Sequence, residues 1–213
     1  MKKNIQEQFG ENVIGSFVNF CRADIAETSE LQEGLFGHIE DADLRRYLAQ
    51  TYYGARWLYK IGLGLLVDGD EAIAHVRTQV IDYGSICEAV LADSILFGKK
   101  NNLFKHKKHV TKDCGPASQK NMINWDKIIK SGSLQKMNFW WIIEVSEDEG
   151  IIDGKHKAVL NKLRALRNTV HVTELASRRE AYFRTLAKNS FKTANETIDA
   201  TKRYKETFIK HDA

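Results

Sequence analysis

The stretch DEAIAHVRTQVIDYGSICEAVLADSILF, from Asp70 to Phe97, decides the fold class of this chain. Its apolar residues recur every three or four positions, which is the period of one face of an α-helix. The predicted buried stripe consists of Ile73, Val76, Val80, Tyr83, Cys87, Val90 and Leu91. We expect Asp70 to cap this helix and Gly98 to end it. The helix is therefore longer than the average helix of about 11–12 residues.

Helical periods also precede and follow this stretch. A first amphipathic helix is predicted from Lys3 to Cys21, and a second from Asp41 or Asp43 to Leu65. A last long helix is expected to begin with a capping box, Ser177 to Glu180, and to continue to Phe208. The chain of 213 residues has a single proline, which also favours helices. We predict an all-α protein with one main domain at residues 41–213 and an N-terminal helical extension at residues 1–40.

Composition excludes several classes of protein. The formal net charge is +4, with 28 acidic residues, so the total charge by itself does not indicate a nucleic-acid partner. The three cysteines, Cys21, Cys87 and Cys114, show no C-x-x-C spacing and suggest a reducing compartment. The N-terminus lacks the apolar run of a signal peptide, and the apolar stretch Ile61–Val67 is far shorter than the about 20 residues that cross a bilayer. We therefore expect a cytoplasmic protein without membrane contact.

The stretch Leu163–His171, LRALRNTVH, is the strongest candidate for a site. On a helix, Arg164, Arg167, Asn168 and His171 fall within a sector of roughly 100°. Histidine exchanges protons near neutrality because its unperturbed pKa is about 6.5, and guanidinium is the donor best matched to phosphate. The pattern predicts a phosphodiester site. The alternative is a packed helix whose arginines lie at the edge of the core and whose histidine has no chemical role.

A basic segment lies between residues 99 and 112. Its lysines are Lys99, Lys100, Lys105, Lys107, Lys108 and Lys112. Clustered lysines release counterions when they contact phosphates, so the segment is a candidate RNA-binding surface; a solvated loop is the alternative. His106, His109 and Cys114 lack a fourth ligand at a familiar spacing, so we expect neither a metal nor a cofactor.

Two further features have simpler interpretations. Trp140 and Trp141 could stack on bases, but in an apolar context tandem tryptophans more often fill a core. Glu88 follows Cys87 on the long predicted helix and is expected near the edge of the core. We keep Glu88 as a supporting site candidate.

The chain resembles the HEPN superfamily, a group of small all-α domains found in prokaryotic defence and toxin–antitoxin systems and in some RNA-processing proteins. The resemblance covers roughly residues 45–205 and rests on three segments, Tyr83–Leu91, Glu149–Asp153 and Leu163–His171. The family motif is an arginine, four to six residues and a histidine. Arg164 and His171 fit it with six residues between them, whereas Arg167 stands one residue too close. Thr173 occupies the position of a tyrosine that a partner nucleotidyltransferase modifies in some of these toxins, so we do not expect that regulation.

The resemblance implies an antiparallel helical bundle of HEPN type and metal-independent cleavage of single-stranded RNA by the 2′-hydroxyl. His171 would act as general acid or base, Arg164 and Arg167 would stabilise the phosphoryl charge, and Asn168 would orient His171 or bind phosphate. One chain supplies one motif histidine, so a homodimer with a composite site is expected. Glu88 would then relieve repulsion between the arginines.

A non-catalytic function is the competing interpretation. Many members of the family lack nuclease activity, and the Arg/His face could bind a nucleotide or another protein. An antitoxin or another defence protein is therefore a candidate partner under either interpretation.

Overall fold

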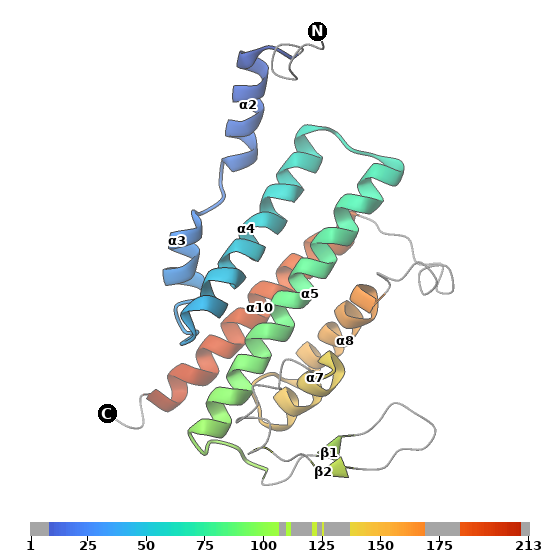
Figure 1. The fold of residues 1–213 in the computed structure, drawn as a ribbon. Helices are drawn as coiled ribbons and strands as arrows, with labels where there is room; N and C mark the ends of the chain where they lie inside the picture. The colour runs from blue at the N-terminus through green and yellow to red at the C-terminus, as the bar shows by residue number, and fades with distance from the viewer. Residues whose placement is uncertain are drawn as a thin grey trace.

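In the computed structural model, helices lie side by side around the long helix α5 (Figure 1). The structure describes residues 9–106, 110–111, 121–122, 125, 137–168 and 184–209. The helices are α2 (Glu11–Arg22), α3 (Thr28–Glu30), the π-helix η1 (Leu31–Leu35), α4 (Ala42–Gly64), α5 (Gly69–Lys100), α7 (Phe139–Asp148), α8 (Gly154–Asn168) and α10 (Arg184–Ile209). The strands β1 (Val110–Thr111) and β2 (Asn121–Met122) form a short antiparallel pair. The predicted all-α class is confirmed apart from this pair.

Helix α5 begins two residues earlier than predicted. The carboxylate of Asp68 accepts a hydrogen bond from the backbone N–H of Gly69 at 2.8 Å and caps the helix, while Asp70 lies in the first turn. The predicted stripe is buried from Val76 to Leu91, but Ile73 is 38% exposed. The first turn therefore extends beyond the core.

The predicted end of this helix at Gly98 is wrong, because α5 continues through Gly98 to Lys100. A Cβ atom at Gly98 would lie 2.5 Å from the hydroxyl of Tyr204 and 2.9 Å from the ring of Phe104. The glycine is thus used for close packing of rings against the helix and not for a turn.

Helix α4 begins as the sequence predicted. The carboxylate of Asp41 accepts hydrogen bonds from the backbone N–H groups of Asp43 and Leu44, at 2.9 and 3.0 Å. This is the N-cap arrangement that satisfies free amides in the first turn of a helix.

An aromatic cluster joins three helices in the core. The ring of Tyr52 on α4 lies 6.3 Å from that of Tyr83 on α5 and 6.0 Å from that of Phe191 on α10. Tyr83 and Phe191 are 5.7 Å apart. Phe36, which precedes α4, is fully buried and meets Tyr52 edge-on at 6.1 Å. Residues before position 40 thus contribute to the main core; the division at residue 40 stays a prediction.

Helix α10 runs in the same direction as α5. Ala187, near its start, shares a cavity with Val76, and Lys205, near its end, pairs with Asp93 at 2.5 Å. Helix α4 is antiparallel to both. The α5–α10 pair therefore departs from the purely antiparallel bundle that was expected.

The apolar core surrounds the tandem tryptophans, as predicted. Trp141 is 4% exposed, and Trp140 is half-buried against the core. Trp125 lies 5.6 Å from Trp141 and 5.2 Å from Phe104. Within the described ranges, no helix combines the length and the apolar character that a membrane crossing requires.

Candidate functional site

Helix α8 carries the described part of the Arg/His stretch. The helix begins after Asp153, whose carboxylate accepts a hydrogen bond from the backbone N–H of His156 at 2.7 Å. Leu160 and Leu163 are buried and hold α8 against the bundle. Arg164, Arg167 and Asn168 lie in the last turns, as the sequence predicted, and Asn168 is exposed. His171 lies outside the described residues.

Arg167 is anchored to two other helices. Its Nη1 lies 2.5 Å from Oε2 of Glu88 on α5, and its guanidinium carbon lies 5.7 Å from the ring centre of Phe139 on α7. Its aliphatic part covers Gly84, where a Cβ atom would come within 3.0 Å of the Arg167 Cδ. Arg167 therefore ties α8 to α5 and α7.

The pairing neutralises much of the charge of Arg167. Both side chains are mostly buried, with 27% of Arg167 and 24% of Glu88 exposed. Burial raises the pKa of the Glu88 carboxyl, and the positive charge of Arg167 opposes that rise. Glu88, a supporting candidate from the sequence, thus does meet one of the predicted arginines.

Arg164 has a different environment, although it is only three residues away. It is half-buried, and its Nε donates a hydrogen bond to the side-chain oxygen of Asn161 at 3.3 Å. Among the described residues, no carboxylate lies within ion-pair distance of it. Within the part of the chain that the structure describes, Arg164 therefore differs from Arg167 in having an amide as its neighbour.

Two of the predicted RNA-binding lysines, Lys99 and Lys100, are separated from Arg164 and Arg167. Lys99 and Lys100 belong to the last turn of α5, so the alternative of a solvated loop is wrong for these two residues. They are eleven and twelve residues beyond Glu88, which corresponds to about 17–18 Å along a helix. Lys99 lies 6.0 Å from the ring centres of both Phe104 and Trp125, which accounts for its partial burial.

A buried carboxylate fixes the chain directly after α5. Glu149 is 2% exposed and accepts hydrogen bonds from the backbone N–H groups of Lys105 and His106, at 2.6 and 3.2 Å. The Nδ1 of His106 lies 3.3 Å from the same carboxylate. The side chain of Lys105 remains exposed. Lys107, Lys108 and Lys112, with His109 and Cys114, lie outside the described residues.

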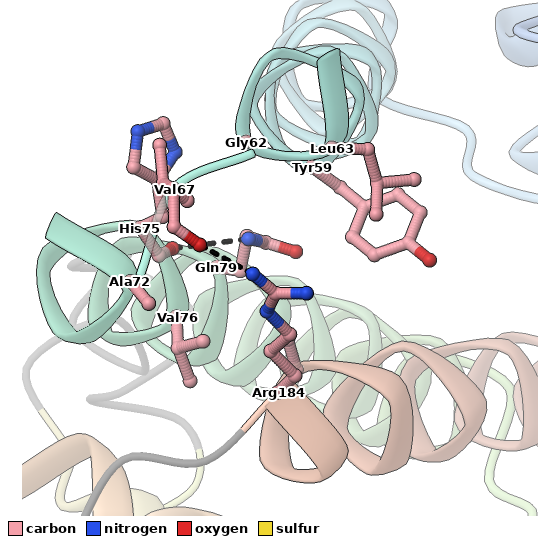
Figure 2. A pocket seen from close by; sticks show the side chains of 10 residues that line it. Tyr59, Gly62, Leu63, Val67, Ala72, His75, Val76, Gln79 and Arg184 are labelled. Carbon is pink, nitrogen blue, oxygen red and sulfur yellow. Dashed lines mark hydrogen bonds between the residues drawn. The ribbon is translucent and has the colours of Figure 1, made fainter. Parts of the chain in front are cut away.

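A second arginine fixes the start of α10. Figure 2 shows a cavity between the end of α4 and the starts of α5 and α10, where the guanidinium of Arg184 donates a hydrogen bond to the backbone oxygen of Val67. Beside it, the amide of Gln79 donates to the backbone oxygen of His75 at 3.0 Å. The cavity has a volume of about 30 Å³, enough for one or two water molecules and too little for a nucleobase. Arg184 thus ties the start of α10 to the turn between α4 and α5.

His156 is a titratable group that the sequence did not single out. Its Nε2 lies 2.8 Å from the hydroxyl of Thr197, which donates its proton to the backbone oxygen of Thr193 at 2.7 Å. His156 must therefore donate through Nε2, and burial lowers its pKa. It lies eleven residues before Arg167, about 16 Å along α8. It is a packing residue that no local pattern would have revealed.

Among the described residues, no group of three or more metal-binding side chains stands close enough to hold a metal ion. No family model, no curated protein and no solved structure matches this chain. What the site can do therefore follows from its own residues.

Proposed function

We propose that this protein is a metal-independent endoribonuclease of HEPN type, which cleaves single-stranded RNA at a composite site formed by two copies of the chain. A defence or toxin–antitoxin setting is part of this proposal. One observation carries it: Arg164 lies near the end of α8 without a carboxylate partner among the described residues, while the neighbouring Arg167 pairs with Glu88. Arg164 is also the arginine whose spacing to His171 fits the family motif.

The reaction assigns a role to each residue of the stretch. His171 of one copy accepts the proton of the 2′-hydroxyl, whose oxygen attacks the adjacent phosphorus. The bond to the 5′-oxygen breaks, and His171 of the other copy protonates that oxygen. The products are a 2′,3′-cyclic phosphate and a free 5′-hydroxyl. Arg164 stabilises the negative charge on the phosphoryl oxygens, because guanidinium can donate two parallel hydrogen bonds to phosphate.

In this proposal, Arg164 and Arg167 have different roles. Arg167 positions the helix end through Glu88 and contributes less to phosphate binding, because its charge is already balanced. Asn168 is exposed on the same turn and is available to orient His171 or the phosphate. Lys100, in the last turn of α5, and Lys105, five residues later, are exposed and would contact more distant phosphates.

Product analysis tests the reaction. Wild-type protein and His171→Ala, purified identically, are incubated with single-stranded RNA in the presence of EDTA. We expect cyclic phosphate ends from the wild type and at least a hundredfold less cleavage by the variant, as for loss of a general acid–base catalyst. Equal cleavage by both proteins would exclude a role of His171.

A non-catalytic adaptor is the second candidate, and the Arg167–Glu88 pair favours it, because a balanced ion pair at a helix contact is typical of a structural role. Growth on expression separates the two. Toxicity that His171→Ala abolishes supports the nuclease. Expression of the wild type without growth cost or RNA damage supports the adaptor.

A further inference from the structure

A pocket with two positively charged side chains lies at the end of the bundle where α5 and α10 both end (Figure 1). It has a volume of about 280 Å³ and is formed by the segment after α5, the turn from α7 to α8 and the last turns of α10. Lys105 lines it from the first of these segments and Arg203 from α10. Both side chains are exposed, and within the described ranges neither has a carboxylate at ion-pair distance.

The ammonium group of Lys105 lies beside a glycine. A Cβ atom at Gly150 would come within 2.6 Å of the Lys105 Nζ, and the φ of Gly150 is +73°, which L side chains rarely adopt. The backbone N–H of Lys105 donates a hydrogen bond to the carboxylate of Glu149 at 2.6 Å. Glu149 thus fixes the backbone from which Lys105 extends, and Gly150 leaves room for its charged end.

Glu149 also lines the pocket, but its carboxylate is directed toward the chain after α5. It is 2% exposed and accepts hydrogen bonds from the backbone N–H groups of Lys105 and His106. The described lining therefore presents two exposed positive charges and one buried negative charge, which favours an anionic ligand.

Aromatic rings form another part of the lining. The rings of Tyr204 and Phe208 on α10 meet edge-on, with their centres 5.2 Å apart. The hydroxyl of Tyr204 lies against Gly98 of α5, so the pocket receives the apolar part of this ring. Phe208 is half-buried. Flat bases stack on aromatic side chains whatever their sequence, so the lining suits a ligand with a base as well as an anionic group.

We propose that this pocket binds a nucleoside phosphate, with the phosphate group at Lys105 and Arg203 and the base against Phe208. A phosphate monoester carries a charge of about −1.5 to −2 at pH 7, which two cations balance, and guanidinium can donate two parallel hydrogen bonds to it. The volume lies just below the about 300–1,000 Å³ of small-molecule sites, so it suits one nucleotide unit. That unit is a free nucleotide or the phosphorylated end of an RNA strand.

The pocket is separate from the proposed cleavage site. Ile151 lines it directly before α8, whereas Arg164 lies ten residues beyond the start of that helix at Gly154, about 15 Å along its axis. Nucleotide binding at this pocket goes beyond the proposed function and does not depend on RNA cleavage.

Calorimetric titration of the full chain with adenosine 5′-monophosphate (AMP) tests the pocket. We expect saturable binding that Arg203→Gln weakens at least tenfold, through loss of a charged hydrogen-bond donor, and that Phe208→Leu weakens at least fivefold, through loss of stacking. Lys188→Gln is the matched control and should bind AMP like the wild type. Lys188 is an exposed lysine of the same helix, fifteen residues and about 22 Å before Arg203. Circular dichroism checks that every variant is folded.

Further ligands identify what the pocket recognises. Adenosine, which lacks the phosphate, should bind at least tenfold more weakly than AMP, and inorganic phosphate, which lacks the base, at least fivefold more weakly. A short oligoadenylate that binds at least tenfold more tightly with a 5′-phosphate than with a 5′-hydroxyl identifies an RNA end as the ligand. A smaller difference identifies the free nucleotide.

Three results would overturn the nucleotide site: no AMP binding, inorganic phosphate binding as tightly as AMP, or equal AMP affinity in the wild type and Arg203→Gln. Arg164→Ala should bind AMP like the wild type, and loss of binding in this variant would place AMP at the proposed cleavage site instead. AMP binding by a wild type that does not cleave RNA would overturn the proposed function and leave the nucleotide site standing.

Discussion

The two arginines of α8 differ in their partners although they differ little in sequence context. Arg167 meets Glu88 at 2.5 Å on a mostly buried surface, and Arg164 has an amide neighbour instead. The sequence placed Glu88 near the edge of the core and both arginines on one helix face. It could not decide which arginine Glu88 would meet, because that depends on how α8 packs on Gly84, a tertiary contact.

Loss of Arg167 should destabilise the protein. Arg167→Ala leaves a mostly buried carboxylate without its partner, which costs about 1–3 kcal/mol of the free energy of unfolding. Urea denaturation measures this. Adding Glu88→Gln should recover part of the loss, because a neutral amide is cheaper to bury than a charge. No recovery in the double variant would show that the ion pair is not the cause.

His38 should make stability depend on pH. Its Nε2 lies 3.1 Å from the hydroxyl of Thr201, and burial, followed by the charge of Lys205, lowers the pKa of His38 to about 4. The unfolded chain binds this proton near pH 6.5, so the native state loses stability as the pH falls from about 6.5 toward 4, and is unaffected above that range.

Denaturation of wild type and His38→Gln at pH 7 and pH 5 isolates this contribution. The wild type should lose roughly 1–2 kcal/mol more than the variant over this interval. The comparison cancels the contributions of groups that both proteins share, such as Asp82. Burial raises the pKa of Asp82 to about 6, so its contribution to the pH dependence of stability has the opposite sign. Equal losses in the two proteins would rule out His38 as the titrating group.

At the scale of elements, the chain shows why helix existence is easier to predict than helix ends. The periodicity of Asp70–Phe97 and the cap at Asp41 were sufficient to predict α5 and α4. In the sequence, Gly98 resembles a residue that ends a helix. In the structure it makes room for the ring of Phe104, six residues later, and for the hydroxyl of Tyr204 on α10. Such a use of glycine cannot be read from local sequence.

Two glycines in helices should respond to alanine with opposite signs. Gly54→Ala in α4 places its Cβ where nothing lies within 4 Å, so it should stabilise the protein by about 0.5–1 kcal/mol through helix propensity. Gly98→Ala should destabilise it by about 1–3 kcal/mol, because the methyl group collides with Tyr204 and Phe104. Thermal denaturation of both variants decides this; stabilisation by both would mean that the packing at Gly98 is loose.

At the scale of the whole molecule, α5 is the helix on which α4, α7, α8 and α10 pack. Its length separates Lys99 and Lys100 from the arginines of α8. The sequence predicted the all-α class and the tryptophan core, but not that α10 runs parallel to α5. The direction of α10 depends on contacts such as that of Lys205 with Asp93, which are 112 positions apart in the sequence. Lys99 and Lys100 were expected beyond the helix because Gly98 was expected to end it, but they belong to the last turn of α5.

The cleavage rate of Arg164→Ala tests the proposed division of labour most directly. The control is Lys155→Ala, which removes an exposed positive charge from the same helix, nine residues before Arg164. We predict that Arg164→Ala lowers the rate of RNA cleavage in EDTA at least a hundredfold with an unchanged melting temperature, whereas Lys155→Ala cleaves within a few-fold of the wild type. Cleavage by Arg164→Ala at the wild-type rate would contradict the assignment of Arg164 to the phosphate.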